Sequence, residues 1–255
     1  MGPIALTVPL VQVETVMLAS VRFAAFFVLA PPFSHRAIPA QVKVALSLGL
    51  ALAVSPRIEP LADDSTPAFV AALVAQALVG AALGFGVLMV FSALQSAGGF
   101  IDIFGGFQVS SGYDPLGMTS GAVFQRFYQL LALVLLFASD GYLVVLGGLV
   151  RTFDALPVDA ILDPGAVAEN LAGGVGQLFL AALQIAGPMV VVLFLADVGL
   201  GLLTRVAPAL NAFALGFPLK VLLTLIMSGF AVVGLPHVVE ALTGRSVADL
   251  MGVLP

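Results

Sequence analysis

Residues 69–97 read FVAALVAQALVGAALGFGVLMVFSALQSA, an apolar stretch that contains no charged residue. As an α-helix it is about 43 Å long at a rise of 1.5 Å per residue, which exceeds the roughly 30 Å hydrocarbon core of a bilayer. Small residues are frequent in it, and Gly80, Gly84 and Gly86 allow another helix to come close. The stretch therefore predicts a membrane-spanning helix that packs against other helices.

The rest of the 255-residue chain has the same apolar character. Hydrophobic residues make up 61% of the sequence and charged residues 9%, whereas soluble globular proteins carry about 25% charged residues. Neither an internal repeat nor a soluble domain is recognisable, so the sequence predicts one all-α, polytopic membrane unit over residues 1–255. We expect about six apolar segments, at approximately residues 8–30, 44–54, 69–97, 127–150, 175–206 and 213–233.

Several of these segments are too short or too irregular for a simple up-and-down bundle. Segment 44–54 lies between two prolines and gives only about 16–20 Å of helix, which is too short to cross a bilayer alone. In segment 127–150, Ser139-Asp140-Gly141 is a turn signal that puts an acid at mid-segment, which favours a hairpin of two short limbs. Gly187-Pro188 predicts a bend in a later segment. Together these features predict bent helical hairpins.

The composition excludes most catalytic and cofactor chemistry. Without cysteine the chain can form no disulfide, thiolate metal site or thiol nucleophile. His35 and His237 are far apart, each in a predicted loop near a proline, and they lack the spacing of paired metal ligands. The net charge of −5 and scattered cations argue against nucleic-acid binding. We therefore expect no enzyme, no cofactor, no metal site and no nucleic-acid partner.

Two charged residues, Asp197 and Lys220, lie in apolar surroundings and need an explanation. Placing such a residue at the centre of a membrane helix costs about 2.5–3.5 kcal/mol on insertion scales. The favoured interpretation is a structural pair, or separate interfacial residues with the lysine reaching the headgroups. The alternative is a proton or ion relay in a small secondary transporter, but a relay usually needs a chain of titratable groups.

The stretch 97–121, AGGFIDIFGGFQVSSGYDPLGMTSG, is the least helix-like part of the sequence. Its many glycines permit backbone conformations that other residues rarely adopt. Phe100, Phe104, Phe107 and Tyr113 nevertheless keep it apolar, which is unusual for an exposed connection. We expect a loop that is buried in protein or lines a pore.

Three stretches, 22–56, 80–115 and 203–220, together resemble the FliR family of flagellar export proteins, and the resemblance covers nearly the whole chain. The first stretch holds the pattern A-P-x-F-S-x-R-x-I-P-x-x-V-K at residues 30–43. Phe104 and Ala209 depart from the polar residues expected in the family. The resemblance implies structural or partner-contact roles for Pro31, Arg36, Pro39, Lys43, Asp102, Arg205, Pro208, Asn211, Pro218 and Lys220.

The resemblance also implies a fold and a function. The fold is a FliP-like part followed by a FliQ-like part, and the function is that of a structural, channel-lining subunit of the flagellar type III protein export gate. Such a subunit assembles with FliP and FliQ, meets FlhB and FlhA, and passes unfolded flagellar proteins through the bacterial inner membrane at the flagellar basal body. Membrane lipid is a further partner. The injectisome counterpart, SctT, has the same fold and remains an alternative.

In that family the loop between the third and fourth apolar segments helps to close the export channel. By match, this loop falls on residues 105–121 of the present chain. The resemblance therefore implies that the pore loop contains Gly105, Gly106, Phe107, Tyr113, Asp114, Pro115 and Met118.

Overall fold

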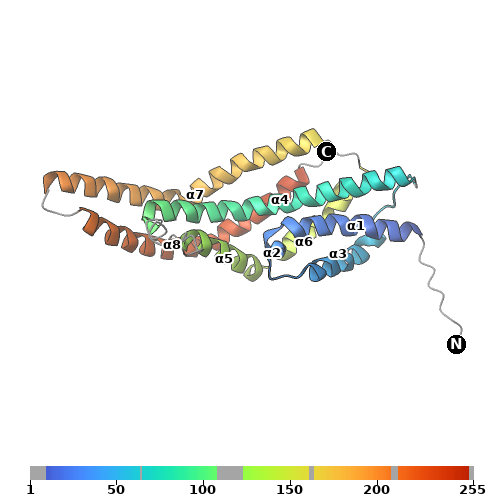
Figure 1. Ribbon diagram of the computed structural model, residues 1–255, viewed down its shortest axis with the longest axis horizontal. Helices are drawn as coiled ribbons and strands as arrows, with labels where there is room; N and C mark the ends of the chain where they lie inside the picture. Colours follow the sequence, from blue (N-terminus) through green and yellow to red (C-terminus); the bar gives the residue numbers. More distant parts are fainter. Residues whose placement is uncertain (1–9, 64, 108–122, 161–163, 208–211, 253–255) are drawn as a thin grey trace, which may run out of the picture. The chain divides into compact units, whose positions relative to one another are not determined.

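The computed structural model describes residues 10–63, 65–107, 123–160, 164–207 and 212–252. All regular elements in these ranges are helical, which confirms the predicted all-α class (Figure 1). The elements are α1 (Leu10–Leu29), α2 (Pro31–Ser34), α3 (Ala40–Val54), the 3-10 turn η1 (Ser55–Arg57), α4 (Thr66–Gly105), α5 (Val123–Ala138), α6 (Gly141–Ala155), α7 (Pro164–Val206) and α8 (Ala212–Gly252).

Four described helices are long and apolar enough to cross a membrane. They are α1, α4, the Val167–Val206 part of α7 and the Ala214–Pro236 part of α8, and α5 with α6 would add a fifth if the broken pair counts as one span. The polytopic membrane class is therefore confirmed. Helix α3 has only 15 residues and begins directly after Pro39, as the flanking prolines predicted.

The predicted break in segment 127–150 is confirmed. Helix α5 ends at Ala138 and α6 begins at Gly141, with Asp140 between them at a positive φ of 54°. Aspartate tolerates this left-handed backbone conformation better than most residues. Asp140 is exposed. That α5 and α6 form the two limbs of a hairpin stays a prediction.

Three segment boundaries were predicted wrongly. Residues 98–105 are helical and continue α4, although their glycines suggested a loop. Helix α7 begins at Pro164. Proline fits the first helical position because an N–H group there would have no acceptor within the helix. Helix α8 runs on to Gly252, so His237 lies in a helix and not in a loop. Helices α7 and α8 also continue through Pro188 and Pro218, and the bend predicted at Pro188 stays a prediction.

The chain forms two compact units. Unit 1 contains residues 1–89, 142–174 and 243–255, and unit 2 contains residues 90–141 and 175–242. Helices α4, α7 and α8 therefore each contribute to both units. The sequence-based expectation of a single FliR-like unit, built from a FliP-like and a FliQ-like part, stays a prediction.

In unit 1, α1 packs against α2, α3 and α4. Its buried face includes Leu18, Phe23 and Phe26, each at most 1% exposed. Gly80 and Gly84 of α4 lie directly on the backbone of α1, so that a β-carbon on Gly84 would be 2.9 Å from the Phe26 carbonyl oxygen. The close approach predicted for these two glycines is confirmed.

In unit 2, the end of α4 packs against α5 in the same manner. A β-carbon on Gly98 would be 2.5 Å from the Phe124 carbonyl oxygen and 2.7 Å from the α-carbon of Gln125. By contrast, only 22% of the residues in an apolar 18-residue stretch of α7, and 11% of those in a similar stretch of α8, are buried. Large apolar side chains are exposed on both helices, namely Phe179, Val191, Phe194, Leu195, Leu202, Leu222, Leu225, Ile226, Phe230 and Val233.

Candidate functional site

The structure describes only the first three residues of the predicted pore loop, Gly105, Gly106 and Phe107. Gly105 is the last residue of α4, Gly106 has a φ of 80°, and the Gly106 N–H donates to the Ile103 carbonyl oxygen at 3.3 Å. Glycine is favoured in this left-handed position just after a helix. The remaining predicted loop residues lie outside the described part of the chain, namely Tyr113, Asp114, Pro115 and Met118.

Contacts between α4 and α5 bring the two described edges of this loop together. The ring of Phe107 meets the ring of Phe124 edge to face, with 5.1 Å between centroids. Gly98 lies against the backbone of Phe124 and Gln125. We call Gly98, Asp102, Phe107, Phe124 and Gln125 the loop stem.

Asp102 is the polar centre of the loop stem. Its side chain is 0% exposed, and its two carboxylate oxygens accept the backbone N–H groups of Phe124 and Gln125, each at 2.9 Å. N–H groups in the first turn of a helix have no partner within the helix, and they form the positive end of its dipole. Asp102 thus caps α5 from another helix. Among the side chains that the structure describes, no cation forms an ion pair with it.

Helix α8 borders the end of α4. Thr224 is 0% exposed, its hydroxyl donates to the Lys220 carbonyl oxygen at 2.8 Å, and this hydroxyl would be 3.0 Å from a β-carbon on Gly105. A β-carbon on Gly106 would be 3.8 Å from the ring of Phe217. The predicted motif residue Pro218 is exposed in the same helical turn.

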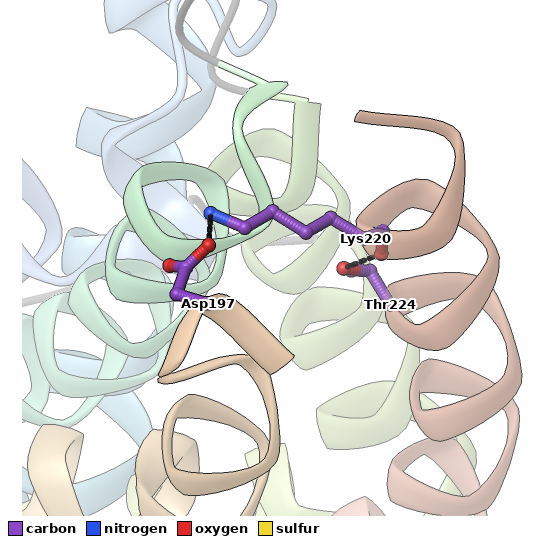
Figure 2. Close-up of polar contacts among 3 residues, drawn as sticks. All are labelled: Asp197, Lys220 and Thr224. Atoms are coloured by element: carbon purple, nitrogen blue, oxygen red, sulfur yellow. Dashed lines mark hydrogen bonds and ion pairs between the residues drawn. The ribbon is translucent and has the colours of Figure 1, made fainter. Parts of the chain in front are cut away.

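Asp197 and Lys220 form an ion pair between α7 and α8. Figure 2 shows the lysine side chain reaching from α8 to the carboxylate, with 2.6 Å between Nζ and Oδ1. Lys220 is 20% exposed and Asp197 is 45% exposed. The two residues therefore pair, as the structural interpretation of the sequence expected. One turn away, Thr224 binds the backbone of Lys220 (Figure 2).

Neutralising one member of this pair is expected to harm the protein more than neutralising both. A single Asp197→Asn or Lys220→Met substitution leaves a lone charge among apolar side chains, whereas the double variant leaves none. The measurement is the thermal unfolding midpoint of the purified chain in detergent for both single variants and the double variant. If the double variant lost as much stability as the two single variants added together, the pair would not couple the helices.

The motif around residues 30–43 shapes the turn that leads into α3. Pro31 opens α2, and the Pro39 carbonyl oxygen accepts the N–H groups of Val42 and Lys43 at 3.0 and 3.3 Å. Lys43 is half-buried and Arg36 is exposed. Arg36 is thus placed to meet solvent, headgroups or a partner.

The remaining motif residues lie around the α7–α8 connection. Arg205 is exposed in the last turn of α7, where a cation interacts favourably with the negative end of the helix dipole. Pro208 and Asn211 lie outside the described residues.

Arg22, a buried cation in α1, was not singled out from the sequence. Its guanidinium is 0% exposed and donates to Gln76 Oε1 at 2.6 Å, to Thr152 Oγ1 at 3.1 Å and to the Leu156 carbonyl oxygen at 2.8 Å. It also lies 3.9 Å from the centroid of the Phe153 ring. All of these partners are uncharged. The signal that could have identified Arg22 is its position inside an apolar segment, because an ionisable residue there needs partners.

These polar groups connect helices to one another. Arg22 joins α1 to α4 and α6, Asp102 joins α4 to α5, and Lys220 joins α8 to α7. In the described ranges, no group of three His, Cys, Asp or Glu residues is placed to hold a metal ion. Arg22, Asp102 and Lys220 are instead each held by a contact between helices.

Comparison with known proteins identifies the family. Residues 13–246 match the family described as Bacterial export proteins, family 1. The chain is 33% identical over 237 residues to the flagellar biosynthetic protein FliR of Pectobacterium carotovorum subsp. carotovorum, covering 91% of this chain and 88% of the relative. It is 31% identical to FliR of Bacillus subtilis (strain 168), covering 83% of each chain. It is also 30% identical to the Yop proteins translocation protein T of Yersinia pestis, covering 78% of each. The chain therefore belongs to the family 1 bacterial export proteins, the family of FliR, as its sequence motifs implied.

Proposed function

We propose that this chain is a structural, channel-lining subunit of the flagellar type III protein export gate. It assembles with homologues of FliP and FliQ and meets FlhB and FlhA in the inner membrane at the flagellar basal body. The observation that carries the proposal is the family match over residues 13–246 of an apolar chain whose described regular elements are all helical. In this role the chain makes and breaks no bond, and other subunits supply the energy for export.

The flagellar system is favoured over the injectisome by the extent of similarity. The FliR of Pectobacterium carotovorum matches 91% of the chain at 33% identity, whereas the Yersinia translocation protein T matches 78% at 30% identity. The same family fold serves both proposals, so the choice affects the partners and not the architecture.

The exposed apolar faces of α7 and α8 support an assembled state. Only 11% of the residues in an 18-residue stretch within 214–236 of α8 are buried, and side chains such as Phe230 and Val233 are 74% and 76% exposed. Apolar surface of this extent on a protein requires lipid or a partner to cover it. In the proposal, partner subunits and membrane lipid share this surface.

The partner proposal is tested by purifying the chain from cells that express the other gate components. Co-purification with FliP and FliQ homologues supports the gate, and a stable homo-oligomer without them contradicts it. The secondary-transporter alternative makes the opposite prediction, because the purified chain alone would then carry protons or solutes across liposomes.

The loop of residues 105–121 is proposed to help close the channel through which unfolded flagellar proteins pass. Deleting residues 108–120 is expected to raise the ion conductance of membranes that contain the assembled gate, because the plug is lost while the loop stem is kept. The measurement is conductance in planar bilayers or dye efflux from vesicles. A matched control replaces the same residues with a Gly-Ser segment of equal length. Unchanged conductance in both variants, with normal assembly, would contradict the plug.

A further inference from the structure

The start of α5 depends on a hydrogen-bond acceptor from a distant part of the chain. A helix N-terminus is usually capped by a Ser, Thr, Asp or Asn side chain at the residue just before it. Phe124 and Gln125 lie in the first described turn of α5, which begins at Val123. The acceptor is instead Asp102, which lies 22 residues before Phe124 and 23 before Gln125.

The geometry at Asp102 suits an acceptor for the first turn of α5. Each of its two oxygens accepts one N–H, from consecutive residues and at the same distance of 2.9 Å. Hydrogen bonds to an ionised acceptor are stronger than bonds between neutral groups, and burial strengthens them further. The side chain is 0% exposed, so water does not compete for either oxygen.

A second contact holds the same two residues of α5 independently of Asp102. Gly98 lies one helical turn before Asp102 on the same face of α4, because residues four apart share a face. It is in contact with the backbone of Phe124 and Gln125, where a β-carbon would come within 2.5 to 2.7 Å of their atoms. The neighbouring Gly99 differs, since its β-carbon would meet nothing closer than the Gln125 Oε1 atom at 3.9 Å.

We propose that Asp102 is a positioning residue that fixes the first turn of α5 on α4 and thereby holds the export channel in its closed resting state. The part of this inference that concerns the channel rests on the proposed function. The part that concerns α5 does not, because it follows from the buried carboxylate and its two backbone donors. Asp102 thus acts within the chain and not as a partner contact, which the family resemblance had left open.

The first experiment measures hydrogen exchange of the Phe124 and Gln125 amides in the full chain within the purified gate. Asp102→Asn keeps one acceptor but turns an N–H₂ group toward the second backbone donor, so exchange of the two amides is expected to accelerate at least tenfold. Gly98→Ala is expected to have a similar effect by pushing α5 away. Gly99→Ala is the matched control and should leave exchange within twofold of the parent. Unchanged exchange in Asp102→Asn would overturn the inference.

The second experiment separates positioning from simple helix capping. Asp102→Ala removes both the cap and the tether, and adding Ala122→Asp supplies a local cap without the tether. We expect the added substitution to restore slow exchange at the start of α5 while ion leakage through the assembled gate stays at least threefold above the parent. If the local cap also abolished the leakage, Asp102 would be a helix cap only and the positioning role would be wrong.

Ion leakage through gates that contain Asp102→Ala is compared with leakage through gates that contain the 108–120 deletion, at equal amounts of co-purified partner subunits. Leakage in the deletion but not in the Asp102→Ala variant would overturn the positioning role and leave the plug intact. Absence of leakage in the deletion itself would overturn the proposed plug, and with it the channel part of the inference. The exchange result would then still decide whether Asp102 fixes α5.

Discussion

Replacing Gly80 by alanine is expected to destabilise unit 1 by about 3 kcal/mol. The added β-carbon would overlap the Arg22 carbonyl oxygen and lie 2.9 Å from its carbonyl carbon. Both are backbone atoms that cannot rotate aside, so all of α1 has to move, and its buried aromatic face loses contact with α4. The alanine itself favours a helix by about 0.5–1 kcal/mol, which offsets only part of this cost.

The measurement is the thermal unfolding midpoint in detergent, which should fall by about 6–12 °C at roughly 2–4 °C per kcal/mol for a chain of this size. Gly84→Ala should have a smaller effect, because its nearest backbone atom, the Phe26 carbonyl oxygen, is 2.9 Å away. Gly147→Ala in α6 is the control, since its β-carbon would meet nothing within 4 Å. It should leave the midpoint unchanged or raise it. A fall as large in Gly147→Ala as in Gly80→Ala would refute the close-packing explanation.

Replacing Arg22 by alanine is expected to cost about 3–5 kcal/mol and to have the largest effect of any single substitution proposed. The change leaves the Gln76 amide oxygen and the Leu156 carbonyl oxygen buried without their donor, and it opens a cavity beside the Phe153 ring. Lysine is a poor substitute, because one ammonium group cannot reproduce the planar fork of donors.

The midpoint of Arg22→Ala should fall by about 6–20 °C on the same scale. Arg151→Ala is the matched control, since Arg151 lies in the same unit but is exposed. An Arg22→Ala midpoint within 2 °C of the parent would show that the network adds little to stability.

The fold class was predictable because it follows from apolarity alone, which needs no knowledge of contacts. The break at Asp140 and the start of α3 after Pro39 were predictable for a similar reason, since both come from local backbone chemistry. Gly80 and Gly84 were also interpreted correctly, because small residues four apart in an apolar helix have a known packing use.

The errors came from features whose meaning depends on a distant part of the chain. Gly98 suggested a loop because glycine is flexible, but it is a contact surface for α5 within a continuous helix. Asp102 was identified by resemblance, while its role as a cap depends on residues 22 and 23 positions away. Arg22 was passed over because its partners lie 54 to 134 residues further along, and no local pattern reveals them.

The discontinuity of unit 1 has a consequence for biosynthesis. Its parts come from residues 1–89, 142–174 and 243–255, with unit 2 encoded between them. A ribosome delivers Arg22 to the membrane long before Leu156, the acceptor 134 residues later. During that interval the helix that carries Arg22 is surrounded by lipid, insertion machinery or chaperone, and Arg22 lacks its native hydrogen bonds. The nascent chain therefore needs protection during translation, and a truncated product cannot supply a complete first unit.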